Sequence, residues 1–351
     1  MSGLFADQIF WVLVLTTLVL SGMAAFFALF TFLLRLKNEH EARIWAGLEQ
    51  RWGPPNLGVL MEEAHPSSLH PLVKKGEEIH FLEFVFEYAQ RLKSAERDLL
   101  SEATRPYLPL ILPRLKHRRI GIRARAVQTL GTLGLPEYAE AVRDAIQDPA
   151  PYVAAIAARH LAHEVGPKAA DDVCRGLARF TNFRIWYLVD MVVAMGPPAI
   201  PAIRKTLADP DMPVQSRAVV AHALSVLRDL GSADLAANIA IGERDPTFLA
   251  ALLRLLGQVG TPKHAISARE HLESPEFFVR AAATRTLAEL GTAEDLPMLV
   301  ERLNDPSSWV KMAAAKGVYR LGGKAALTAL IDPDDPASPW FRQVLAEETG
   351  R

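Results

Sequence analysis

The chain has 351 residues and a formal net charge of −1, from 39 basic and 40 acidic side chains. This balance excludes a molecule that binds nucleic acid through its overall charge. A single cysteine, Cys174, cannot form an internal disulfide and indicates a reducing compartment. We expect Cys174 to be buried as a small apolar side chain.

Residues 8–34 carry no charge and are almost entirely apolar. This stretch of 27 residues exceeds the ~20 needed to cross a bilayer core. A secretory signal is the alternative, but its apolar region has only ~7–15 residues and follows a basic stretch. Here Asp7 precedes the run and no Lys or Arg does. We therefore predict a transmembrane helix over residues 8–34.

The charges beside this segment predict its orientation. Arg35, Lys37 and Arg43 follow the segment, and no basic residue precedes it. By the positive-inside rule, residues 1–7 are a short non-cytoplasmic N-terminus and the remainder is cytoplasmic. We expect a single-pass protein of the cell membrane, such as a bacterial inner membrane. Whether the helix only anchors the protein or also recognises other helices stays open.

Residues 35–103 link the apolar segment to the rest of the chain. We expect the first helix to run past Trp45 and to end at Gly53-Pro54-Pro55, followed by a loop over residues 56–76. A second helix is expected over residues 79–100, with crowded aromatic side chains that imply burial on several sides. It would close the N-terminal end of the array described next, and a partner-binding groove is the alternative.

A glycine returns at intervals of 32, 30, 35, 29, 31 and 31 residues. The seven positions are Gly134, Gly166, Gly196, Gly231, Gly260, Gly291 and Gly322. One, four and eight residues before each glycine stand apolar residues, which form one stripe of a helix. A period of about 30 residues is typical of a stacked repeat array. The glycine suits a left-handed cap at the end of each helix.

Prolines mark the other borders of each repeat. They stand near the start of a first helix at Pro136, Pro167, Pro197, Pro262 and Pro297. Turns into a second helix are indicated at Asp148-Pro149, Asp209-Pro210, Asp245-Pro246, Ser274-Pro275 and Asp305-Pro306. Each repeat therefore reads as a helical hairpin. The interval of 35 in the fourth repeat implies a longer helix or turn.

The segments from Phe278 to Gly291 and from Val310 to Gly322 resemble the second helix of the HEAT family in its short form. The resemblance covers residues 104–332 and implies an all-α chain. Its parts would be one transmembrane helix and an α-solenoid of about seven helical hairpins. Residues 333–351 would form a C-terminal cap or tail, with the cap at residues 340–347. The family implies a habit of binding macromolecules, not a reaction.

Motifs of catalysis are missing from the sequence. It contains no phosphate-binding glycine loop, nucleophile elbow or zinc helix. The array has one His-Glu pair, His163-Glu164, so it lacks the iron ligands of deoxyhypusine hydroxylases, which are built from related repeats. His160 and His163 have a chelating spacing but no matching carboxylates. No cofactor, metal or small-molecule substrate is expected, and a lyase-like enzyme using the repeat groove stays an alternative.

Two surfaces are candidates for binding. Six residues before each glycine stands a polar residue, and together these form a candidate ridge: Gln128, His160, Asp190, Ser225, Arg254, Arg285 and Lys316. Arg280 and Lys311 would add to its basic end. In HEAT-like arrays the second helices line the concave face, so the ridge would run along it. The alternative is a solvated polar side that any amphipathic helix needs.

The second candidate is a basic turn at the first hairpin. Its members are Arg114, Lys116, Arg118, Arg119, Arg123 and Arg125. Such a cluster can attract anionic lipid headgroups or an acidic protein, or it is a solvated turn. The sequence as a whole favours a cytoplasmic scaffold that docks a membrane-associated protein, as an accessory subunit of a complex such as a glycan-synthesising or secretion machine. An enzyme and a tethered nucleic-acid or lipid binder are the alternatives, with nucleic acid disfavoured.

Overall fold

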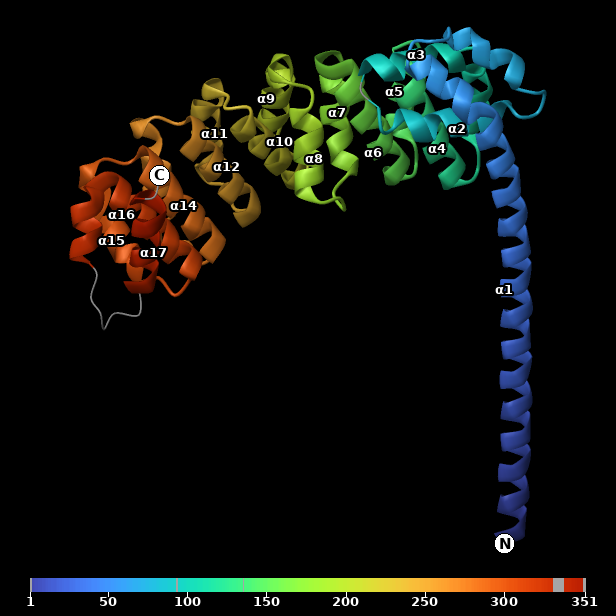
Figure 1. The fold of residues 1–351 in the computed structure, drawn as a ribbon. Helices are drawn as coiled ribbons and strands as arrows, with labels where there is room; N and C mark the ends of the chain where they lie inside the picture. Colours follow the sequence, from blue (N-terminus) through green and yellow to red (C-terminus); the bar gives the residue numbers. More distant parts are fainter. Residues whose placement is uncertain (1, 93, 135, 331–337, 350–351) are drawn as a thin grey trace. The chain divides into compact units, whose positions relative to one another are not determined.

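The computed structural model describes residues 2–92, 94–134, 136–330 and 338–349, and its regular elements in these ranges are helices (Figure 1). The chain divides into two compact units, and the boundary between them follows Tyr107. The first part of the predicted C-terminal cap or tail, residues 333–337, lies outside the described residues.

The first helix is longer than expected. α1 (Ser2–Leu60) continues through Pro54 and Pro55, so the expected end at Gly53-Pro54-Pro55 is wrong. A proline inside a helix removes one N–H and costs about 3 kcal/mol. Packing offsets this cost, because the Trp52 side chain is fully buried and its Nε1 donates to the Leu72 carbonyl at 3.1 Å.

α1 is also the helix that is long and apolar enough to cross a membrane. A bent pair, Ile185–Val193 and Pro197–Ala208, passes the same test of length and composition if it is taken as one span. Its apolar side chains, such as Leu188 and Leu207, are buried inside the second unit. Their burial accounts for the apolar composition of this pair.

Two helices replace the single one expected over residues 79–100. α2 (Glu78–Ala89) ends in tight turns, and α3 (Ser94–Thr104) packs back against it. A straight helix would carry Leu100 away from the core, where it is fully buried. Part of the loop expected over residues 56–76 is helical, because α1 reaches Leu60 and a 3-10 helix spans Pro66–Leu72. The expected burial of the aromatic cluster is confirmed for Phe81, Phe84 and Phe86.

The second unit is a succession of helical hairpins. The second helices of the hairpins are α4 (Ile120–Leu133), α6 (Pro151–His160), α8 (Ile185–Val193), α10 (Val214–Val226), α12 (Pro246–Val259), α14 (Phe277–Leu290) and α16 (Ser308–Ala329). The first hairpin opens with a 3-10 helix, Leu108–Lys116. The other first helices are α5 (Ala139–Asp144), α7 (Ala170–Gly176), α9 (Ile200–Ala208), α11 (Ala233–Ala240), α13 (Ala265–Arg269) and α15 (Leu296–Glu301).

Most second helices of successive hairpins pack on one another. α4 contacts α6, and further along the chain α8 contacts α10, α10 contacts α12, α12 contacts α14, and α14 contacts α16. Small residues such as Ala223, Ala283 and Ala314 are fully buried in these contacts, as the apolar stripe predicts. Cys174 on α7 is buried, and burial raises the pKa of its thiol to about 11. After α16, the terminal helix α17 (Ser338–Thr349) packs against it.

The fourth hairpin differs from the stripe. Leu230 is 73 % exposed, although the spacing predicts an apolar contact there. α10 ends at Val226, and Arg228 takes a left-handed conformation with φ 51°. The longer interval of this repeat therefore lies in a longer turn and not in a longer helix.

The repeating glycine has a different role from the expected one. Gly166 and Gly196 have positive φ, but Gly260 and Gly291 are extended, so a left-handed cap is not the common reason. At Gly291 an added Cβ would lie 2.5 Å from the Leu287 carbonyl oxygen and 2.9 Å from Asp295 Oδ2. The chain needs a residue without a side chain there because it turns tightly against the helix that it leaves.

We predict that Gly291→Ala lowers the stability of the array by about 1–3 kcal/mol, because the new methyl group meets backbone that cannot move away. Thermal unfolding followed by circular dichroism measures the change. Gly121→Ala is the matched control: Gly121 lies in α4 with open space around its Cα, and alanine there should be neutral or stabilise by about 0.5–1 kcal/mol. Equal melting of the two variants would contradict this role of Gly291.

Candidate partner-binding surface

The candidate ridge lies on the second helices, one residue on each. Its members are Gln128, His160, Asp190, Ser225, Arg254, Arg285 and Lys316. All are half-buried or exposed, so the polar side of these helices is confirmed. Its use as a binding surface stays a prediction, because some of its members also make contacts within the chain.

His160 packs against the previous hairpin. An added Cβ on Gly131 would overlap the His160 ring, so the ring fills the space that the glycine leaves open. His163 is exposed, and its pKa is lowered by partial burial and by Arg159. Among the described residues no group of three or more His, Cys, Asp or Glu side chains is placed to hold a metal.

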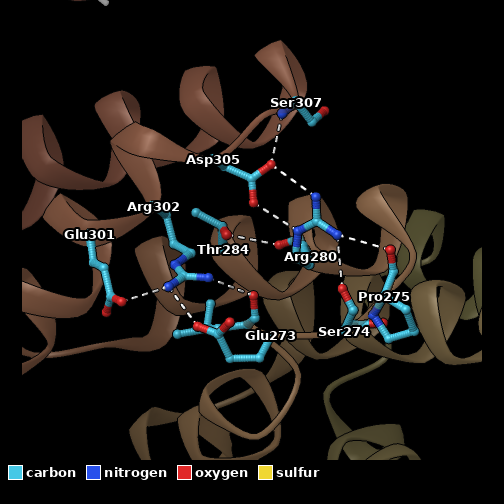
Figure 2. A network of polar contacts seen from close by, with 10 residues as sticks. Glu273, Ser274, Pro275, Arg280, Thr284, Glu301, Arg302, Asp305 and Ser307 are labelled. Carbon is cyan, nitrogen blue, oxygen red and sulfur yellow. Dashed lines mark hydrogen bonds and ion pairs between the residues drawn. The ribbon is translucent and has the colours of Figure 1, made fainter.

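Arg280 does not extend the ridge, because its guanidinium belongs to a contact between neighbouring hairpins (Figure 2). It donates to both carboxylate oxygens of Asp305 at 2.7 and 3.0 Å, and to the carbonyls of Ser274 and Pro275 at 2.9 and 3.0 Å. The side chains of Arg280 and Asp305 are 13 % and 2 % exposed. Burial alone would raise the pKa of Asp305, but the bonds from Arg280 and the Ser307 amide outweigh it and lower the pKa.

The same contact occurs at the other end of the array. Arg123 on α4 donates to Asp148 in the turn of the second hairpin at 2.6 and 2.9 Å, and to the carbonyl of His117 in its own turn at 2.8 Å. Burial would raise the pKa of Asp148, and the bonds from Arg123 and the Ala150 amide lower it. An arginine of one second helix thus joins its own turn to the turn of the next hairpin.

Arginines of first helices form a further set of ion pairs. Arg204 pairs with Asp229, Arg269 pairs with Asp295 at 2.6 Å, and Arg143 pairs with Asp172 at 2.8 Å. The pairs of Arg269 and Arg143 connect one hairpin to the following one, and Arg204 on α9 binds Asp229 in the turn that follows α10. The carboxylates of Asp229 and Asp295 are almost fully buried.

A hollow beside Asp305 is lined by Glu273, Glu301 and Arg302, besides Arg280. Arg302 pairs with Glu273 at 2.5 Å and with Glu301 at 3.0 Å (Figure 2). The charged groups in this hollow therefore bind one another. The arrangement stabilises the array and leaves no free acid or base poised for proton transfer.

The C-terminal end of the ridge is partly covered. Lys316 pairs with Glu347 of α17 at 3.0 Å, and Arg320 pairs with Glu289. Lys311 is half-buried on α16. The basic end of the ridge therefore offers fewer cations to a partner than the sequence predicts. Its remaining arginines are Arg254 and Arg285.

Arg254 and Arg285 lie on the neighbouring helices α12 and α14. Arg254 is half-buried, and its pKa is lowered by burial and by the positive charge of Arg285. On α10 the buried His222 lies close to Arg254, and burial together with that charge lowers the pKa of His222 to about 4. The His222 ring therefore stays neutral at pH 7. Its centroid lies 5.1 Å from that of Trp186 on α8.

The basic turn separates into two groups. Lys116, Arg118 and Arg119 are exposed. Arg123 forms an ion pair with Asp148. Arg114 and Arg125 are half-buried, and each has a partner within the chain. The cluster of six cations is therefore divided, because the sequence gives the charges but not their partners, and its binding role stays a prediction.

Sequence reasoning missed a row of exposed apolar side chains at the starts of second helices. Its members are Ile120, Tyr152, Trp186, Phe277 and Trp309. Most of them stand 13 or 14 residues before the repeating glycine, so the same alignment could have found them. Exposed aromatic residues are enriched where proteins bind proteins, and this row adds an apolar component to the surface.

Comparison with known families finds HEAT repeats in the C-terminal part of the chain. The family model for these repeats matches residues 233–318 and 272–348, which include α11 to α16 and most of α17. The resemblance noted in the sequence is thereby confirmed for this region. HEAT repeats in general are protein-interaction scaffolds. No curated protein matches the chain.

We predict that Arg123→Gln and Arg118→Gln differ sharply in stability, although both remove one charge from the same turn. The first leaves the buried carboxylate of Asp148 without the guanidinium that pairs with it and should cost about 3 kcal/mol. The second removes an exposed charge and should change stability by less than about 0.5 kcal/mol. Chemical unfolding in urea measures both. If Arg123→Gln leaves the free energy of unfolding unchanged, this ion pair does not hold the hairpins together.

Proposed function

We propose that this protein is a membrane-anchored docking scaffold, in which α1 crosses the membrane and the hairpins form a curved α-solenoid that binds a partner protein. The partner would belong to a membrane-embedded complex of which this chain is an accessory subunit. The protein is proposed to act by binding and not by catalysis, since the charged groups in the hollow beside Asp305 are engaged with one another.

The observation that carries the proposal is the exposure of the apolar part of α1. Every large apolar side chain from Leu15 to Leu36 is at least 43 % exposed, on all sides of the helix. A helix that is apolar all round is stable only when it is surrounded by apolar material. Since the described residues of the chain do not cover this surface, lipid is the environment that fits it.

The helix continues without interruption from this segment into the folded first unit. Residues 35–47 are mostly charged or polar and exposed, with i,i+4 ion pairs from Arg35 to Glu39 and from Lys37 to Glu41. Thirteen helical residues span about 20 Å at a rise of about 1.5 Å each. This helical segment would hold the folded part of the first unit at a fixed distance from the membrane. It would lie on the side of Arg35, Lys37 and Arg43, the basic residues that follow the apolar segment.

The second helices offer the surface for the partner. Their polar ridge and the exposed apolar row would together form an interface of mixed character, as protein partners require. Tethering to one membrane raises the effective concentration of the array near partners in that membrane. Nucleic acid fits less well, because several arginines of the array are neutralised by their own ion pairs, among them Arg123, Arg204, Arg269 and Arg280. Anionic lipid headgroups at Lys116, Arg118 and Arg119 remain a secondary candidate.

The test compares the full-length chain with a form that begins at Lys37, each expressed with an affinity tag, crosslinked and purified in detergent. We expect full-length protein in the membrane fraction and the shortened form in the soluble fraction. Both should recover the same partner from a lysate that contains membranes, with a lower yield for the shortened form, because it lacks the tether.

Recovery of the partner by the full-length chain alone would assign recognition to α1 and not to the array. Failure of both forms to recover a reproducible partner would contradict the scaffold proposal. Full-length protein that is found in the soluble fraction would contradict the anchor.

A further inference from the structure

Four neighbouring second helices bring an aromatic ring and two arginines onto one surface. The ring of Trp186 on α8 contacts that of His222 on α10 at a tilt, and Arg254 and Arg285 follow on α12 and α14. α8 packs against α10, α10 against α12 and α12 against α14. Trp186 is 58 % exposed, and Arg285 is exposed beside the half-buried Arg254.

Arg254 differs from the other half-buried arginines of the second unit. In the described part of that unit, each of the others has a carboxylate, a carbonyl, an aromatic ring or a further described contact as its partner. Arg254 has none among the described residues, and the positive charge of Arg285 repels it. Partial burial of an unpaired guanidinium is costly. An external anion would remove this cost.

We propose that Arg254 and Arg285 form the docking site for an acidic segment of the partner protein, with Trp186 as its apolar contact. This inference rests on the proposed scaffold function and names the chemistry of its partner. A guanidinium binds a carboxylate through two parallel hydrogen bonds, and such charge-assisted bonds are the strong ones. Arginine clusters without acidic partners are a common way to recognise acidic motifs.

The charges around the site favour a protein over a nucleic acid. Asp190 is exposed four residues after Trp186, on the same side of α8, so the surface changes sign beyond the two arginines. Lys316, the next member of the ridge, is already paired with Glu347. A phosphate backbone needs a continuous row of cations. Two cations beside an exposed aromatic ring instead fit a short segment that carries carboxylates and one apolar side chain.

The test uses the full-length chain in detergent and a fluorescein-labelled octapeptide rich in glutamate with two leucines. Fluorescence anisotropy measures its binding, and the peptide with glutamine in place of glutamate serves as the neutral probe. We expect wild-type protein to bind only the acidic peptide, and Arg254→Gln or Arg285→Gln to weaken that binding at least about tenfold. Arg244→Gln is the matched control, since Arg244 is an exposed arginine in the turn before α12.

A charge-reversed protein keeps the test decisive if a single variant folds poorly. Arg254→Glu combined with Arg285→Glu should lose the acidic peptide and bind its lysine counterpart. Equal binding of the acidic peptide by wild-type protein and Arg254→Gln, or no binding by wild-type protein, would overturn the inference. Arg254-dependent binding of a single-stranded oligonucleotide, without binding of the peptide, would also overturn it and assign the site to nucleic acid.

The pull-down of the partner separates this inference from the scaffold proposal. If Arg254→Gln recovers the partner as well as wild-type protein does, the acidic docking site is wrong and the scaffold stands. If wild-type protein recovers no partner, the scaffold proposal fails, and the peptide measurement alone decides whether the site binds carboxylates.

Discussion

The structure of the second unit depends on the contact between each hairpin and the next. A single hairpin exposes the apolar faces of both its helices, and these are buried only when a neighbour packs on them. At two such junctions the contact includes a buried ion pair, from Arg123 to Asp148 and from Arg280 to Asp305. Each arginine also binds carbonyls of its own turn. The pairs therefore fix the position of one turn relative to the next, which apolar packing alone does not.

This use of charge also shapes the surface. An arginine that is bound between hairpins cannot attract a partner, and most arginines of the array that are half-buried are used in this way. What remains for binding is a smaller set of free cations and a row of exposed apolar side chains at the helix starts. The two arginines on α12 and α14 stand out against this background because, in the described part of the array, no carboxylate pairs with Arg254.

The sequence predicts the repeat well because the repeat is local. The glycine interval, the Asp-Pro turns and the apolar stripe each depend on residues within one hairpin, and the structure has helices in these places. The continuation of α1 through Pro54 could not be predicted, since it depends on Trp52 packing against distant residues. The partners of Arg123 and Arg280 lie 25 residues away, so the sequence indicates their charge but not its use. Leu230 was misplaced because one irregular turn shifts the stripe.

The most direct test of this account is a double-mutant cycle on Arg280 and Asp305. Arg280→Gln, Asp305→Asn and the double variant are compared with wild-type protein by the free energy of unfolding in urea. If the pair joins neighbouring hairpins, each single change should cost about 3 kcal/mol, and the double change should cost much less than their sum, which gives a coupling above about 1 kcal/mol. Additive costs with no coupling would contradict the claim that this ion pair holds the hairpins together.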